Sequence, residues 1–348
     1  MSSAIDLNAI QIGIGVPGVW EGSVHVDIIG RSGRPLKQAP RSGTSLSTMQ
    51  VGVTGSSGLI GTALVARLRA GGHTAVPIVR RPAHQNSGEI GWSPADGRLD
   101  AASLAGLDAV VHLAGAGIGD HRWTDRYRRQ LLDSRVVSTT LLATKIAELG
   151  NDAPPVLISG SAIGFYGDRG DEPLDESSPA GNGFLAEICT AWEAGTMVAE
   201  SAGIRVAHIR TGIVLARHGG ALKKMLPLFR IGAGGRFGSG RQWMSWISID
   251  DHVRAIEHLL SNPIAGPVNL TAPAPVRNAE FAKTLGKVLR RPSFVPVPEF
   301  GPKLVLGSAL AEALLFDGQR VHPGVLVASG FEFAHPELDG ALRSVLAR

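Results

Sequence analysis

Apolar and polar residues at positions 51–215 fall into blocks that predict strands and helices in alternation. Short apolar runs typical of buried strands occupy residues 51–54, 74–79, 109–113, 155–159 and 205–210, and a weaker run lies at 90–92. Apolar residues recur at helical spacing in 59–68, 123–149 and 185–202. Because strands and helices alternate, the sequence predicts an α/β protein with a doubly wound parallel sheet.

The pattern is less regular after residue 215. A strand is expected at Trp243 to Ile249, and Asp250 is expected to cap a helix that runs through Leu260. A further strand is expected at 268–270, with helices at 278–289, 304–315 and 336–346. Residues 232–240 form a glycine-rich loop.

The first 48 residues differ from the rest of the chain. Gly, Ser, Pro and Arg accumulate from Gly30 to Ser47 without a helical or strand period, and Met49 directly precedes the first strand. We expect either that Met49 is the natural start or that residues 1–48 are a loosely attached, disordered extension. The alternative is a small strand pair formed by Ile10–Ile14 and Val24–Ile29.

A glycine-rich turn follows the first strand. Gly55, Gly58 and Gly61 suit a tight turn, a close backbone approach to a diphosphate, and close packing of the next helix on the strand. The helix that begins at Leu59 would then offer its free N–H groups to phosphate oxygens. A simple strand-to-helix turn is the alternative. A phosphate loop of the ATPase type is disfavoured, because Thr62 follows Gly61 where that motif needs lysine.

Two arginines at the end of the second strand bear on the choice of dinucleotide. An acidic residue there would accept hydrogen bonds from an adenosine 2′-hydroxyl, but this chain carries Arg80 and Arg81. A 2′-phosphate needs a cation at that place, so NADP(H) is the expected cofactor. Two solvated arginines at a strand exit are the alternative.

Composition narrows the class of protein without indicating its activity. With 348 residues, 44% hydrophobic content and 45 glycines, the chain can bury one large core or two modest ones. The net charge of +4 is mild and spread along the chain, so we expect no nucleic-acid partner. No apolar stretch is long enough to span a bilayer, so no membrane partner is expected. The single cysteine, Cys189, excludes an internal disulfide, argues against a structural zinc site and fits a cytoplasmic location.

At this point the chain resembles an extended short-chain dehydrogenase/reductase, in the epimerase-family branch of atypical members. The resemblance covers residues 49–348. Its carriers are Thr54-Gly-Ser-Ser-Gly-Leu-Ile-Gly61, Val111-His-Leu-Ala-Gly115, Asp133-Ser-Arg135, Phe184-Leu-Ala-Glu-Ile-Cys-Thr-Ala-Trp-Glu193, Arg210-Thr-Gly-Ile-Val-Leu215, Trp246-Ile-Ser-Ile-Asp-Asp251, Gly330-Phe-Glu-Phe333 and Pro336-Glu-Leu.

The resemblance implies a Rossmann-type cofactor domain and a small α+β substrate domain of uncharacterised function. The first would comprise residues 49–215 with returning segments 243–271, and the second would comprise segments of 216–348. NADP(H) would lie across the sheet. Its expected contacts are Gly55, Ser56, Ser57, Gly58, Leu59, Ile60, Gly61, Arg80, Arg81, Leu113, Ala114, Gly115, Ser159, Gly212, Ile213 and Val214.

The chain departs from the family at the proton relay. Typical members carry a Tyr four residues before a Lys, which lowers the Tyr pKa so that the phenol exchanges a proton with the substrate. Here the corresponding helix reads Phe184-Leu-Ala-Glu-Ile-Cys189, without Tyr or Lys at that spacing. Ser161 matches the family's substrate-orienting Ser, and Tyr166 is the nearest phenol. These two are the catalytic candidates, with a turn or cap role for Ser161 and a loop anchor role for Tyr166 as the alternatives.

Two arginines near the glycine-rich loop are the candidate substrate contacts. Arg236 and Arg241 could clamp an anionic substrate such as the diphosphate of a nucleotide sugar, or they could simply face solvent. Asp250-Asp251-His252 fits a helix start better than a metal site, so no metal is expected.

Two functions remain open on the sequence. One is an NADP(H)-dependent oxidoreductase or epimerase for a small polar substrate, and the other is an NADP(H)-binding sensor or interaction protein without turnover, as some relatives are associated with cell or organelle division. A monomer or a homodimer is expected.

Overall fold

The computed structural model describes residues 48–84 and 87–347. The expectations for the first 47 residues, including the strand pair at 10–14 and 24–29, lie outside the described residues. The described residues form one compact unit.

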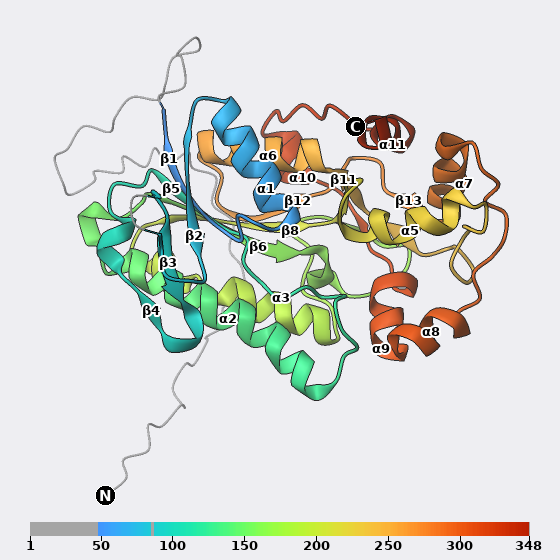
Figure 1. Ribbon diagram of the computed structural model, residues 1–348, viewed down its shortest axis with the longest axis horizontal. Coiled ribbons are helices and arrows are strands. Elements are labelled where there is room, and N and C mark those ends of the chain that lie inside the picture. Colours follow the sequence, from blue (N-terminus) through green and yellow to red (C-terminus); the bar gives the residue numbers. More distant parts are fainter. Residues whose placement is uncertain (1–47, 85–86, 348) are drawn as a thin grey trace, which may run out of the picture. The chain divides into compact units, whose positions relative to one another are not determined.

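A single large sheet organises the described residues, with strand order β12-β8-β6-β5-β1-β2-β3-β4 (Figure 1). Neighbouring strands are parallel except for β3 and β4, which pair in antiparallel fashion. The predicted doubly wound α/β fold is therefore confirmed, with the β3–β4 pair as an addition. The strands are β1 Gln50–Thr54, β2 Thr74–Val79, β3 Ile90–Ser93, β4 Arg98–Leu99, β5 Ala109–His112, β6 Val156–Ala162, β8 Arg205–Thr211 and β12 Gly266–Leu270.

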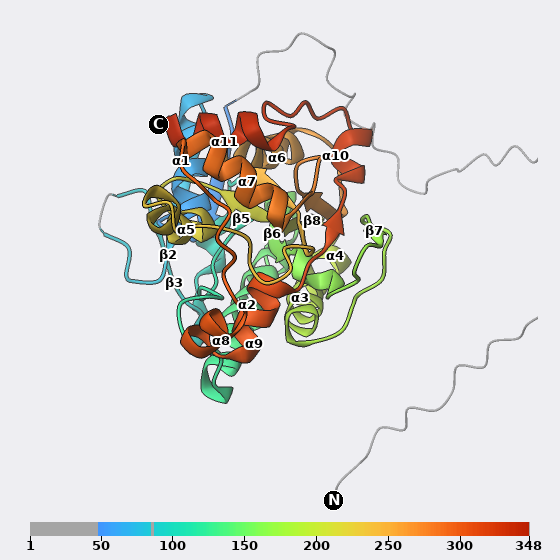
Figure 2. The same cartoon turned by 90° about the vertical axis from the view of Figure 1, so that its right-hand side faces the viewer.

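Helices cover both faces of this sheet (Figures 1 and 2). One face carries α1 Leu59–Ala70, α6 Ile249–Ser261 and α10 Gly324–Ala328, and the other carries α2 Asp125–Ala147, α3 Phe184–Ala194 and α4 Met197–Ser201. Leu64 and Ile256 anchor the first face and Leu142 and Ile146 the second, and all four side chains are fully buried. Burial of each such side chain contributes about 1.5–3 kcal/mol.

A second apolar cluster lies beside the sheet and is centred on the buried Trp246. It joins α5 Gly220–Arg230, α7 Asn278–Leu289 and α11 Leu338–Ala347. Two helices outside this cluster are α8 Phe300–Leu306 and α9 Ser308–Ala311. Three short strand pairs complete the unit: β9 Ile213–Leu215 with β11 Trp246–Ser248, β10 Trp243–Met244 with β13 Val276–Arg277, and β7 Pro173–Leu174 with β14 Arg320–Val321.

Three predicted elements are interrupted in the structure. The helix expected at 185–202 ends at Ala194 and resumes at Met197, and Thr196 is fully buried in the break, where its hydroxyl lies 2.8 Å from His208 Nε2. Gly307, with φ of +87°, separates α8 from α9 in the helix expected at 304–315. The strand expected at 243–249 is divided into β10 and β11.

The expected cap of α6 is wrong by two residues. The Ser248 hydroxyl, not Asp250, accepts the hydrogen bond from the backbone N–H of Asp251 at 3.0 Å, and the helix begins at Ile249. Asp251 is fully buried, and its carboxylate is compensated there by hydrogen bonds from the backbone N–H groups of Ala334 and His335. The acidic pair therefore ties the start of α6 to the C-terminal segment.

In the described ranges, no helix combines enough length with enough apolar character to cross a bilayer.

Candidate functional site

The register of the sheet brings the carboxyl ends of its central strands together. Thr54 at the end of β1 pairs with Ile78 of β2 on one side and with His112 of β5 on the other. His112 pairs in turn with Ser159 of β6. In open α/β sheets, ligands bind outside the carboxyl ends of the strands, at the point where the strand order reverses. Here the order reverses between β1 and β5, so this edge is the candidate cofactor site.

The glycine-rich turn that follows β1 requires glycine at two of its three positions. Gly55 has φ of +64°, and a Cβ there would lie 2.8 Å from the Leu113 carbonyl oxygen. A Cβ on Gly61 would lie 2.1 Å from the Gly55 carbonyl oxygen, so α1 starts in direct contact with the turn. These contacts support the turn and packing roles predicted for Gly55 and Gly61.

Gly58 differs from the other two glycines because its surroundings are open. It is exposed, and the one heavy atom near a Cβ at this position is the Gly55 carbonyl oxygen at 3.2 Å. Gly58 is also the N-cap of α1, and no side chain among the described residues caps the first amides of the helix. Uncapped N–H groups at a helix start, approached through a glycine, suit a phosphate group.

A buried hydrogen-bond network holds the ends of β1 and β5 together. The Thr54 hydroxyl oxygen accepts from the backbone N–H groups of Leu113 and Ala114 at 3.0 and 3.2 Å. Its own hydrogen can then be donated to His112 Nδ1, 2.8 Å away, which leaves Nε2 of the neutral ring to donate to Thr139 Oγ1 at 3.0 Å. Burial lowers the pKa of His112 to about 3. His112 therefore packs as a neutral structural residue.

The two arginines that follow β2 have different surroundings. Arg81 forms a two-pronged ion pair with Glu89, with both N–O distances at 2.9 Å, and this hydrogen bonding lowers the pKa of Glu89. Arg80 is exposed and makes no hydrogen bond or ion pair with any residue in 48–84 or 87–347. Of the two predicted cofactor cations, Arg80 is the one whose guanidinium is available to a phosphate.

The other predicted cofactor contacts lie at the ends of neighbouring strands. Leu113, Ala114 and Gly115 directly follow β5. The Ser159 hydroxyl is buried and has no hydrogen-bond partner within the described chain. Ile213 and Val214 belong to β9, and Gly212 directly precedes this strand. Position 212 requires glycine, because a Cβ there would lie 2.6 Å from the Ser245 carbonyl oxygen. A close backbone contact thus explains the glycine at position 212 without reference to a ligand.

The two predicted catalytic residues meet in one buried polar network. The Ser161 hydroxyl donates to Glu193 Oε1 at 2.7 Å, and the Tyr166 hydroxyl donates to Asn269 Oδ1 at 2.7 Å. Arg210 connects them, since it donates to both Glu193 carboxylate oxygens at 2.9 and 2.8 Å and to the Tyr166 hydroxyl oxygen at 3.1 Å. Tyr166 is fully buried, and burial raises the pKa of its phenol although Arg210 acts in the opposite direction. This environment is the reverse of the lowered Tyr pKa that serves the usual relay.

The helix that carries the relay in typical relatives is α3. Phe184 packs edge-on against Trp123, with ring centroids 5.1 Å apart, and Ile188 is buried. Burial raises the pKa of the Cys189 thiol to about 11. Glu187 is exposed. At the positions of the usual relay, α3 therefore offers only packing residues. The carboxylate that α3 places against Ser161 is Glu193, which is already paired with Arg210.

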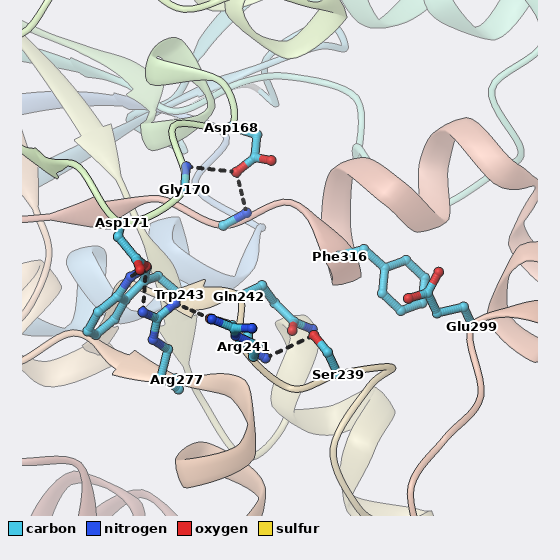
Figure 3. A pocket seen from close by; sticks show the side chains of 11 residues that line it. Asp168, Gly170, Asp171, Ser239, Arg241, Gln242, Trp243, Arg277, Glu299 and Phe316 are labelled. Carbon is cyan, nitrogen blue, oxygen red and sulfur yellow. Dashed lines mark hydrogen bonds and ion pairs between the residues drawn. The ribbon is translucent and has the colours of Figure 1, made fainter.

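The two predicted substrate arginines point in different directions. Arg236 donates from Nη1 to the carbonyl oxygens of Gly238 and Ser239 and so stabilises its own loop. Arg241 lines a pocket of about 290 Å³ together with Asp171, Trp243, Arg277, Glu299, Phe316 and other residues. In Figure 3, Asp171, Trp243 and Arg277 gather on one side of Arg241, and Phe316 and Glu299 lie on the other.

Two guanidinium groups already contact the ring of Trp243 in this pocket. The guanidinium carbons of Arg277 and Arg320 lie 4.0 and 4.9 Å from its centroid, and its Nε1–H donates to Asp171 at 2.9 Å. The pocket thus presents charged and hydrogen-bonding groups more than an open aromatic face, which suits a polar ligand.

Sequence reasoning overlooked the roles of Glu193, Arg210 and Asn269. All three are brought together by packing between distant segments, although Glu193 and Arg210 stand in motifs that the resemblance had marked. Within 48–84 and 87–347 there is no group of three or more His, Cys, Asp or Glu side chains arranged to hold a metal ion.

The parallel sheet, the glycine-rich turn after β1 and the reversal of strand order between β1 and β5 define a Rossmann-type dinucleotide-binding class of protein. Residues 51–271 match the model of the NAD dependent epimerase/dehydratase family, and residues 297–345 match a domain of unknown function, DUF1731. The chain belongs to the NAD dependent epimerase/dehydratase family, which confirms the family predicted from the motifs.

Similar proteins extend over most of the chain. Epimerase family protein Mb2239 of Mycobacterium bovis is 45% identical over 293 residues, which cover 84% of this chain and 96% of the relative. The crystal structure of human epimerase family protein SDR39U1 with NADPH has a TM-score of 0.79 at 36% identity, covering 86% of this chain and 99% of that one. A nucleoside-diphosphate sugar epimerase from Corynebacterium glutamicum has a TM-score of 0.69 at 37% identity, covering 86% of this chain and 58% of that one.

Proposed function

We propose that this protein binds NADP(H) at the carboxyl ends of β1, β2 and β5 and acts as an oxidoreductase or epimerase on a small polar substrate. The observation that carries the proposal is the exposed, uncapped start of α1 at Gly58, next to the end of β2, where Arg80 has no partner among the described residues. The human relative crystallised with NADPH supports the choice of cofactor.

The residues present fit this cofactor. Amides at the start of α1 would hold the diphosphate, and Arg80 would bind the 2′-phosphate. Leu113 to Gly115, fixed by the Thr54 hydroxyl, would form the floor beneath the nucleotide. When bound, a nicotinamide cofactor supplies hydride transfer, and the chain's own contribution is to bind, orient and shield the reacting groups.

Replacing Arg80 with alanine should lower the preference for NADPH over NADH by about 10- to 100-fold, because a charged hydrogen bond contributes ~1.5–3 kcal/mol. Calorimetric titration of both coenzymes into the wild type and the variant measures this ratio. The matched control is Arg81→Ala, which removes an arginine already paired with Glu89 and should change the ratio much less. An unchanged ratio in Arg80→Ala would show that Arg80 does not bind the 2′-phosphate.

On the substrate side, we propose that Ser161 orients the substrate and that the Arg241 pocket binds its polar end. Ser161 lies near the carboxyl end of β6, the strand next to β5. Its hydroxyl already donates to Glu193, so its oxygen lone pairs remain able to accept a hydrogen bond. A sugar or sugar nucleotide fits the polar lining of the pocket, and the Corynebacterium glutamicum relative, a nucleoside-diphosphate sugar epimerase by its description, supports that class. Tyr166 stays the candidate phenol, although its hydroxyl is held by Arg210 and Asn269.

If Ser161 and Tyr166 take part in turnover, Ser161→Ala and Tyr166→Phe should each lower kcat by about 10²-fold or more, since positioned proton donors contribute that much. A panel of carbonyl and sugar-nucleotide substrates followed by NADPH absorbance provides the measurement. NADPH affinity serves as the internal control and should stay unchanged in both variants. Undiminished turnover in either variant would remove that residue from the mechanism.

A second function is favoured by one specific observation, the apolar face of α3. With Phe184, Ile188 and Cys189 where the relay stands in typical relatives, the protein could bind NADP(H) without turnover and act as a sensor or interaction partner. This function predicts saturable NADPH binding, no oxidation of NADPH across the substrate panel, and a partner whose affinity changes with cofactor state.

The cytoplasmic location and the monomeric or homodimeric state stay predictions of the sequence. Size measurement by light scattering with and without NADPH tests the second of these.

A further inference from the structure

Two arginines of α2 lie over two aromatic rings of α3. The guanidinium carbon of Arg128 is 5.0 Å from the centroid of Phe184, and that of Arg135 is 5.0 Å from the centroid of Trp192. Between these contacts, Ile188 of α3 packs in a buried cluster with the α2 residue Leu131. The positive charges beside α3 therefore come from the neighbouring helix, because α3 itself contains no Lys or Arg.

Arg135 lies directly against the backbone that follows β5. Its Nη2 donates to the Ala116 carbonyl oxygen and its Nη1 to the Leu131 carbonyl oxygen, both at 3.0 Å. A Cβ on Gly115 would lie 3.5 Å from the guanidinium carbon. Ser134, the preceding residue, accepts from the Ala116 N–H at 3.1 Å. The guanidinium is thus fixed beside Gly115, at the edge assigned above to the cofactor.

The charge of Arg135 has no carboxylate partner in the described part of the chain. By contrast, the buried Arg210 is paired with Glu193 and the exposed Arg81 with Glu89. Burial lowers the pKa of Arg135, which means that its surroundings penalise the positive charge. A partly buried cation that is bonded only to carbonyl oxygens keeps free donors and gains from an incoming anion.

Arg135 and Ser161 both influence the buried Cys189 thiol of α3. Burial is the main influence on the Cys189 thiol and raises its pKa to about 11, while the charge of Arg135 and a hydrogen bond with Ser161 act in the opposite direction. The same thiol therefore lies within electrostatic reach of Arg135 and in contact with Ser161.

We propose that Arg135 binds an oxyanion, a phosphate or a carboxylate, of the ligand that lies beside Gly115. The inference rests on the proposed function, because that proposal places the cofactor along Gly115. The oxyanion has two sources, the diphosphate of the cofactor or an acidic group of the substrate. In both cases, the positive charge comes from α2, because α3 contains no Lys or Arg.

The test uses the full chain and three variants. Arg135→Gln removes the positive charge, and Arg135→Lys keeps the charge but lacks the planar guanidinium group. The matched control is Arg205→Gln, since Arg205 is likewise a partly buried arginine that donates to carbonyl oxygens, those of Leu259, Leu260 and Ile264. It stands at the amino end of β8, away from the strand ends that form the site. Circular dichroism melts confirm that each variant is folded.

Calorimetry then has two arms. The first titrates NADPH, and the second titrates inorganic phosphate or oxalate into NADPH-saturated protein. If the oxyanion belongs to the cofactor, Arg135→Gln weakens NADPH binding about tenfold or more. If it belongs to the substrate, NADPH affinity is kept and binding of phosphate or oxalate weakens by that factor. In either arm, Arg135→Lys should retain part of the affinity, and Arg205→Gln should match the wild type.

Affinities in Arg135→Gln equal to those of Arg205→Gln in both arms would overturn the inference and leave the proposed function intact. If the wild type takes up no NADPH, the proposed function fails by itself. Phosphate and oxalate are then titrated into the protein without NADPH. Weaker binding in Arg135→Gln than in the wild type would support an oxyanion site at Arg135, and equal binding would overturn it.

Discussion

A Gly61→Ala variant should lose saturable NADPH binding and should be destabilised by about 3 kcal/mol or more, at the upper end of what overpacking costs. The added methyl group would lie 2.1 Å from the Gly55 carbonyl oxygen and 2.8 Å from Ser56 Cα. Both contacts are with backbone, so no side chain can rotate away to relieve them. The start of α1 must therefore move away from the turn, and the amides that would hold a diphosphate move with it.

Gly58→Ala is the matched control for this substitution. Its added methyl group would lie 3.2 Å from the Gly55 carbonyl oxygen, a contact that a small shift relieves, and the extended backbone of Gly58 suits any residue. Gly58→Ala should melt close to the wild type and still weaken NADPH binding, because the methyl group would stand where the phosphate approaches. Equal melting temperatures for Gly61→Ala and the wild type would contradict the packing argument.

Removing the negative charge of Glu193 should have the largest effect among the polar substitutions. Glu193→Gln leaves Arg210, whose side chain is 5% exposed, without its counter-charge, and loss of one partner of a buried pair costs about 3–5 kcal/mol. Urea denaturation of the wild type and the variant measures the difference in the free energy of unfolding. Tyr166 and Ser161 should also lose order, since both depend on this pair for a hydrogen bond.

A surface ion pair provides the comparison for Glu193. Glu257 pairs with Arg67 at 2.6 Å, but the Arg67 side chain is 45% exposed, so Glu257→Gln should cost about 0–1 kcal/mol. Combining Glu193→Gln with Arg210→Met should recover part of the stability, because the double variant buries no uncompensated charge. A Glu193→Gln cost no greater than that of Glu257→Gln would show that water or another group already compensates Arg210.

Sequence reasoning succeeded where local pattern determines the structure. The strand at Thr74–Val79 and the helix at Asn278–Leu289 have the bounds that the apolar pattern predicted. The strand packs into the clusters of the sheet and the helix into the cluster around Trp246, so in each case the buried side chains follow the local pattern. The turn at Gly55–Gly61 was predictable for a similar reason. Gly55 is required by its positive φ, and Gly61 is required by its contacts with Gly55 and Ser56.

Where tertiary contacts decide the structure, the sequence pattern was misleading. The helix expected at 185–202 is interrupted because Thr196 turns inward to His208, a partner on β8. Asp250 looked like a helix cap, but the buried partner of the C-terminal segment is Asp251 and the cap is Ser248. Neither partner could be identified before the strands and helices were placed in space.

The same limit applied to the candidate site. Arg80 and Arg81 are adjacent and equivalent by sequence, and only the position of Glu89 distinguishes them. Arg236 and Arg241 were likewise inseparable until the loop was seen to close on Arg236. The chemical type of each side chain was predictable, and its partner was not.

The hydrogen bond between Thr54 and His112, which joins the ends of β1 and β5, does not respond to ordinary changes of pH. An imidazole that gains its proton only near pH 3 carries no charge in any compartment of a living cell, so the link between the two central strands stays constant there. Whatever pH dependence an activity of this protein shows must therefore originate in the ligand or in groups other than His112.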